Sequence, residues 1–125
     1  MGLFKNYVEK LSKSPEETRN EGLRMWAETV PNAVPIAKLE ARQRACVAGV
    51  IQNIRIDPTD ASGSIEATII DGTGEAVVRW LGRRTMSGIR LGMGLVVDGI
   101  IGQTSHGEPM ILNPEYRLVV GPEHG

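Results

Sequence analysis

The stretch SIEATIIDGTGEAVVRW, residues 64–80, is the part of this sequence that most restricts the possible folds. Apolar and polar residues alternate before and after the segment DGTG, residues 71–74, as they do in strands with one buried face. Gly72 and Gly74 can adopt positive φ at little steric cost, and the Asp71 side chain can bond to nearby backbone N–H groups. The sequence therefore predicts a tight β-hairpin at this position.

Further strands are predicted on both sides of this hairpin. Residues 42–56 form a long run rich in β-branched residues, and the central Gly49 indicates a bend or a bulge. Residues 95–101 alternate again, and residues 109–120 read as a last strand interrupted by Asn113-Pro114. Five short antiparallel strands, the first long and bent, are typical of a mainly β fold, the five-stranded Greek-key barrel of the OB (oligonucleotide/oligosaccharide-binding) type. An SH3-like barrel is the alternative from pattern alone.

The periodicity before Pro31 is helical. Residues 3–12 place five apolar side chains at spacings of one, three and four, which predicts a short helix with one apolar side. Ser14, followed by a proline and then by Glu17, predicts an N-cap and a capping box for a second helix. This helix should continue to about Thr29, because Pro31 cannot extend it.

The predicted helices and strands divide the chain into three parts. Residues 1–37 form a short N-terminal helical extension and connector, residues 38–120 form the barrel, and residues 121–125 form a tail. Trp26 is interpreted as an apolar anchor that docks the second helix on the barrel or on a partner.

Composition limits the possible functions. The formal net charge is −1 across 125 residues, so a nucleic-acid site must be a local patch. The single cysteine, Cys46, rules out an intrachain disulfide and fits a reducing compartment. The N-terminus carries charges and never runs apolar long enough for a signal or membrane-spanning segment. We expect a cytoplasmic protein with no membrane partner.

Signals for catalysis are weak. The segment Gly72-Thr73-Gly74 lacks a third glycine and precedes a strand, so it does not fit a dinucleotide-binding turn. His106 and His124 lack the paired ligands that zinc needs, and no orienting acid accompanies Ser105-His106. We therefore predict no enzyme, no catalytic residue, no metal and no cofactor.

Residues 44–118 resemble the OB-fold nucleic-acid-binding domains of the anticodon-binding and RecG-wedge group. The matching stretches are residues 47–51 (VAGVI), 71–74 (DGTG), 95–99 (LVVDG) and 113–116 (NPEY). With its helical head, residues 35–37 (PIA) and residues 80–84 (WLGRR), the whole chain is similar to small stand-alone OB-fold proteins of actinobacteria. The resemblance implies an OB barrel that binds nucleic acid. The helix that usually links the third and fourth strands of such domains has no counterpart in this sequence.

OB domains bind single strands on the face of the second and third strands, between the loop after the first strand and the loop after the fourth. Here these loops are residues 59–62 and 103–108, and the face should expose Glu66, Thr68, Val77 and Arg79. Arginine suits contact with phosphates and bases because its donors are planar and bidentate. The candidate nucleic-acid-binding residues are Thr68, Val77, Arg79, Arg83, Arg84, His106 and Tyr116.

Two observations oppose tight binding of single-stranded DNA or RNA. Nine acidic residues balance nine basic residues over residues 38–120, and the only aromatic residues there are Trp80 and Tyr116. Trp80 alternates in phase with core residues, whereas Tyr116 could face either way. The sequence therefore predicts a non-enzymatic module that binds single-stranded nucleic acid weakly. The main alternative is a protein-interaction module that docks through the N-terminal helices, and a hydrolase is a remote third.

Overall fold

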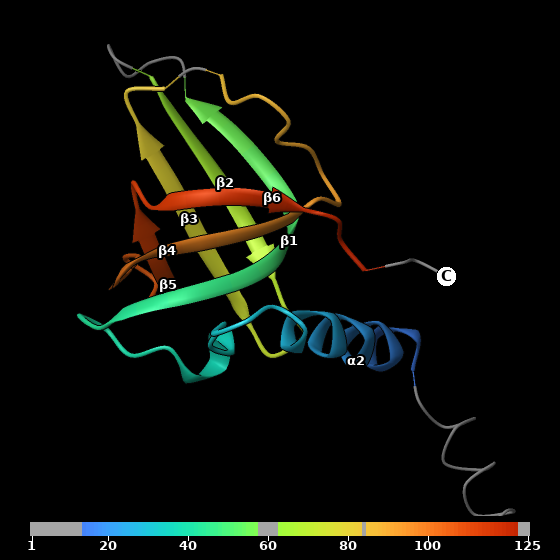
Figure 1. The fold of residues 1–125 in the computed structure, drawn as a ribbon. Coiled ribbons are helices and arrows are strands. Elements are labelled where there is room, and N and C mark those ends of the chain that lie inside the picture. Colours follow the sequence, from blue (N-terminus) through green and yellow to red (C-terminus); the bar gives the residue numbers. More distant parts are fainter. Residues whose placement is uncertain (1–13, 58–62, 84, 123–125) are drawn as a thin grey trace, which may run out of the picture.

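The structure, a computed structural model, describes residues 14–57, 63–83 and 85–122. Figure 1 shows a small barrel with a helix at one end. The elements in chain order are α2 (Pro15–Glu28), the 3-10 helix η1 (Ile36–Lys38), β1 (Arg44–Asp57), β2 (Ser64–Ile70), β3 (Glu75–Leu81), β4 (Gly94–Gln103), β5 (Pro109–Leu112) and β6 (Glu115–Val119).

The strands close into the ring β1-β2-β3-β5-β4-β1, so the predicted five-stranded OB-type barrel is confirmed. β5 and β6 are the two parts of the predicted last strand, and both pair antiparallel with β4. They are separated at Asn113-Pro114, where Asn113 has a φ of 50°. The expectation of antiparallel strands throughout is wrong at one place, because β3 and β5 pair in parallel where the ring closes.

β1 belongs to both ends of the barrel, as the sequence predicts for a long bent first strand. Its first half pairs with β4 and its second half with β2, and Val50 takes part in both ladders. The irregularity in register lies between Ile51 and Asn53, two residues beyond the predicted Gly49. Gly49 serves close packing instead, since a Cβ at this position would lie 2.8 Å from Cβ of Ile69.

The interior of the barrel is apolar, and every strand from β1 to β5 contributes to it. The largest fully buried apolar side chains are those of Ile51, Ile69, Leu95, Ile111, Val47, Val78 and Val97. Trp80 is 3% exposed, and its Nε1 donates a hydrogen bond to the backbone oxygen of Pro114 across 3.3 Å. Its predicted place in the core is confirmed.

α2 packs against the outside of the barrel, as expected of the N-terminal extension. Ser14 is its N-cap, and Oγ of Ser14 accepts a hydrogen bond from the backbone N–H of Glu17 across 3.1 Å. Nε1 of Trp26 donates to the backbone oxygen of Val120 across 3.0 Å, so this side chain anchors the helix to the barrel. The helix predicted for residues 3–12 lies outside the described residues.

The turn between β2 and β3 packs closely against α2. Gly72 has a φ of 85°, and a Cβ on it would lie 2.1 Å from the backbone oxygen of Asn20 in α2.

Between β3 and β4, residues 85–93 form turns and contain neither helix nor strand. Among the described residues, no helix has the length and apolar character needed to cross a bilayer.

Candidate nucleic-acid interface

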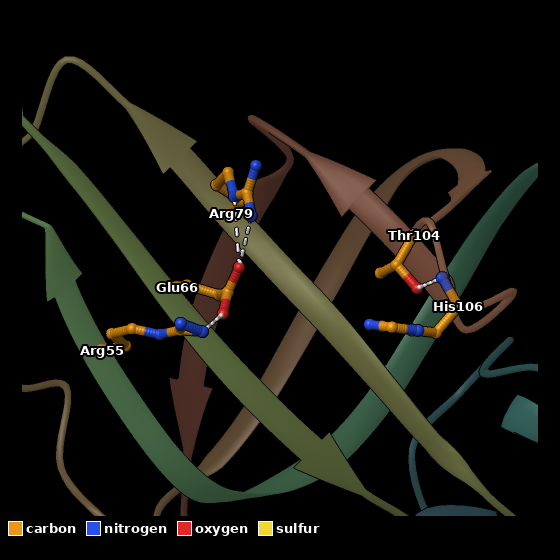
Figure 2. Close-up of polar contacts among 5 residues, drawn as sticks. All are labelled: Arg55, Glu66, Arg79, Thr104 and His106. Carbon is orange, nitrogen blue, oxygen red and sulfur yellow. Dashed lines mark hydrogen bonds and ion pairs between the residues drawn. The ribbon is translucent and has the colours of Figure 1, made fainter. Parts of the chain in front are cut away.

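Charged side chains gather on the outer face of β1, β2 and β3. The hairpin places Glu66 directly opposite Arg79, and the ladder between β1 and β2 places Arg55 opposite Glu66 on the other side. Side chains at directly opposed positions of neighbouring strands lie close enough to interact. Figure 2 shows Glu66 between the two arginines.

Glu66 holds both guanidinium groups. Its Oε1 accepts hydrogen bonds from Nε of Arg79 at 3.2 Å and from Nη2 of Arg79 at 2.6 Å. Its Oε2 lies 3.5 Å from Nη2 of Arg55, which makes an ion pair longer than a hydrogen bond. The Glu66 side chain is 19% exposed, whereas those of Arg79 and Arg55 are 43% and 70% exposed. The carboxylate is therefore largely covered, and the two cations face solvent.

A hollow of about 170 Å³ lies over this cluster. Its lining residues are Arg55, Asp57, Ser64, Glu66, Arg79 and Leu81. Two cations and two anions share the lining, so the hollow is charged but has no net formal charge. Leu81 is 47% exposed at its edge, and Leu112, which pairs with Arg79 across β3 and β5, is 48% exposed. The site thus offers oriented cationic donors beside exposed aliphatic surface.

The prediction that Val77 is exposed is wrong. Val77 lies on the outer side of β3 but is only 7% exposed. Thr68 on β2 and Met110 on β5 lie directly opposite it on either side, and a valine side chain between two occupied neighbours is covered. Thr68 itself is half-buried. Val77 is therefore not available to a ligand, and Thr68 is available only in part.

Three other predicted residues lie beyond the end of β3, in the loop between β4 and β5, or outside the described residues. Arg83 is exposed just beyond the end of β3. Arg84 and the loop at residues 59–62 fall among the residues that are not described. His106 is exposed in the loop between β4 and β5, where its backbone N–H donates to Oγ1 of Thr104 across 3.2 Å (Figure 2).

Tyr116 is half-buried and packs against the core. Its ring meets that of Trp80 edge to face, with centroids 5.3 Å apart and planes at 66°. This arrangement is favourable for an aromatic pair inside a protein. Tyr116 therefore packs against the core at Trp80, and it also lines a hollow together with Cys46 and Arg117, away from β2 and β3.

The opposite side of the barrel carries a second hollow, between the connector and β6. It has a volume of about 350 Å³, and its lining includes Cys46, Asp98 and Arg117. Burial raises the pKa of the Cys46 thiol, the negative charge of Asp98 raises it further, and the positive charge of Arg117 lowers it in part. The thiol is therefore mainly protonated near neutral pH, which lowers its reactivity because only the thiolate is the nucleophile. Within residues 14–57, 63–83 and 85–122, no group of His, Cys, Asp and Glu could hold a metal ion.

Arg55 is the site residue that the sequence analysis did not place. Its position opposite Glu66 depends on the irregularity in β1 after Ile51, which shifts the register of every following residue. A shift of one residue turns a strand's side chains to the other face. The pairing of Glu66 with Arg79, in contrast, could be predicted from the sequence. The two residues are equidistant from the centre of the DGTG turn, and a tight hairpin pairs such residues.

Known proteins share the fold of this chain. A RecG chain in a structure bound to a three-way DNA junction is similar with a TM-score of 0.58 and 16% identity, over 82% of this chain. This chain spans only 14% of that RecG chain. A chain of a replication protein A heterotrimer bound to single-stranded DNA is similar with a TM-score of 0.50 and 22% identity, over 80% of this chain and 77% of that one. No protein-family model and no curated protein sequence matches the chain.

Proposed function

We propose that this chain is a non-enzymatic OB-fold module that binds single-stranded nucleic acid weakly through the outer face of β2 and β3. The observation that carries the proposal is the cluster of Arg55, Glu66 and Arg79 in a hollow on this face. OB domains use the same face for oligonucleotides. The likeness to a DNA-bound RecG chain and to a replication protein A chain bound to single-stranded DNA supports the same class of ligand.

Weak binding follows from the charges of the face. Affinity for nucleic acid depends on the number of phosphates that the protein neutralises. Arg55, Arg79 and Arg83 provide three cations, and two acidic side chains line the same hollow. A module with so few phosphate contacts should bind at low salt and release the strand at physiological salt.

Two finer features belong to this proposal. The first is that the chain is related to the stand-alone OB-fold proteins of actinobacteria, which is proposed from the sequence motifs quoted above. A nucleic-acid ligand also agrees with the cytoplasmic location expected from the single cysteine.

One of the two surfaces considered for the protein-interaction alternative, the Trp26 face of α2, packs against the barrel. Trp26 packs at Gly94 and donates its hydrogen bond to Val120, so it is occupied by the barrel. The Phe4 and Tyr7 face of the N-terminus lies outside the described residues.

Fluorescence anisotropy of a labelled single-stranded oligonucleotide, titrated with the purified chain at several salt concentrations, tests the proposal. We expect binding at low salt and a slope of log affinity against log salt of about −0.7 per phosphate neutralised. Arg79→Ala should weaken binding, whereas Arg117→Ala, which removes an exposed arginine from the opposite side, should leave it unchanged. No binding at low salt would refute the proposal.

A further inference from the structure

We infer that this face recognises the phosphodiester backbone and does not read the bases, so that its ligand class is any flexible polyphosphate chain. The inference rests on the proposed function and deepens it. Two observations support it: the aromatic side chains pack inside or against the barrel, and the Glu66 carboxylate is bound by two arginines.

Trp26, Trp80 and Tyr116 are not exposed, and the exposed ring of His106 lies in the loop between β4 and β5, not on β2 or β3. Trp80 is in the core, and the Tyr116 ring packs against it edge to face. Trp26 is half-buried under the barrel, with its Nε1 bonded to Val120. OB domains that bind single strands usually stack bases on exposed aromatic rings, and this face has no such platform among its described residues.

The carboxylate at the centre of the cluster, Glu66, is not placed to read a base edge. A carboxylate can recognise a base by accepting hydrogen bonds from its amino group. Both oxygens of Glu66 are engaged instead, one by Arg79 and the other by Arg55, and the side chain is largely covered. Glu66 therefore positions the arginines and is not presented to a ligand.

The arginines keep donors that suit phosphate. A guanidinium has five N–H groups, and the contacts of Arg79 with Glu66 use its Nε–H and one N–H of Nη2. The remaining N–H groups of Arg79, and those of Arg55, belong to side chains that are 43% and 70% exposed, so a ligand can reach them. Guanidinium geometry matches two phosphate oxygens at once. The neighbouring Leu81 and Leu112 are exposed aliphatic residues with no side-chain group that could hydrogen-bond to a base edge.

The test compares three probes of about 12 units, a length within the range that one OB domain covers. They are a fluorescein-labelled oligothymidine, the same labelled strand with every base removed, and inorganic polyphosphate, which serves as an unlabelled competitor and is also titrated directly by isothermal titration calorimetry. We expect the two strands to bind within about threefold of each other and polyphosphate to displace both. One base stacked on an aromatic ring would instead raise affinity at least about fivefold. Arg55→Ala and Arg79→Ala should weaken all probes by the same factor, and Arg117→Ala should weaken none.

Each outcome decides between the inference and the proposed function. Binding of oligothymidine with a loss of fivefold or more for the abasic strand would overturn the inference and leave the proposed function standing. Binding of polyphosphate without either strand would overturn the proposed function and retain a phosphate site on this face. Absence of binding by every probe at low salt would overturn both.

Discussion

Asp71 and Ile36 join two distant parts of the chain, since Oδ2 of Asp71 accepts a hydrogen bond from the backbone N–H of Ile36 across 2.9 Å. Oδ1 of the same carboxylate accepts from Thr73 and from the backbone N–H of Gly74, which fixes the turn between β2 and β3. Asp71 is 2% exposed. One buried carboxylate therefore shapes the central turn and attaches the connector to the barrel.

We expect Asp71→Asn to destabilise the protein by about 1–3 kcal/mol, because a buried donor left without an acceptor costs that much. Asparagine keeps one oxygen for the turn but places an NH₂ group where Ile36 needs an acceptor. Urea unfolding followed by circular dichroism measures the change. Glu75→Gln, at an exposed position beside the same turn, is the control and should change stability little.

Gly49→Val should destabilise the fold by about 1–3 kcal/mol, the usual cost of overpacking a core. A Cβ at Gly49 would lie 2.8 Å from Cβ of Ile69, which is itself fully buried, so the barrel wall must shift to admit it. Thermal and urea unfolding measure this loss. An unchanged unfolding midpoint would show that β1 and β2 can move apart at Gly49 and Ile69 without loss of stability.

Gly22→Ala is the matched control for that experiment. A Cβ on Gly22 meets nothing within 4 Å, and the residue lies inside α2. Alanine is favoured over glycine in a helix by about 0.5–1 kcal/mol. This substitution should raise stability by that amount, so the two glycine variants should move the midpoint in opposite directions.

The sequence predicted the fold well because its main signals are local. Ser14 caps its own helix, the DGTG turn pairs the strands on either side of it, and alternation identified Trp80 as a core residue. Each of these features depends on residues within a few positions along the chain, which is the range over which periodicity and turn chemistry act.

The site was less predictable because it depends on contacts between distant strands. Arg55 reaches Glu66 only through the shifted register of β1, and Val77 is covered by Met110 from a strand more than thirty residues away. The sequence indicated that Asp71 would bond to its own turn, but its bond to Ile36, 35 residues away, requires the folded barrel. Propensity carries no information on such pairings.

Cys46 should react slowly with iodoacetamide in the native protein, because burial and the neighbouring Asp98 raise its pKa and only the thiolate reacts. Asp98→Asn should lower the pKa and move the pH–rate profile of alkylation to lower pH. Arg117→Ala should move it to higher pH, since Arg117 lowers the pKa. Mass spectrometry of timed samples measures these rates. A shift in the same direction for both variants would contradict the charge assignment.

Charge reversal beyond the end of β3 tests the extent of the interface. Arg83 is exposed and Arg84 follows it, so Arg83→Glu with Arg84→Glu should abolish binding of single strands at low salt by replacing attraction with repulsion. The melting temperature should hardly change, because exposed charges contribute little to stability. Arg90→Glu with Arg117→Glu makes the same change in net charge at exposed positions elsewhere. Equal loss of binding in both double variants would show that only net charge matters. Binding that survives the first would confine the interface to Arg55 and Arg79.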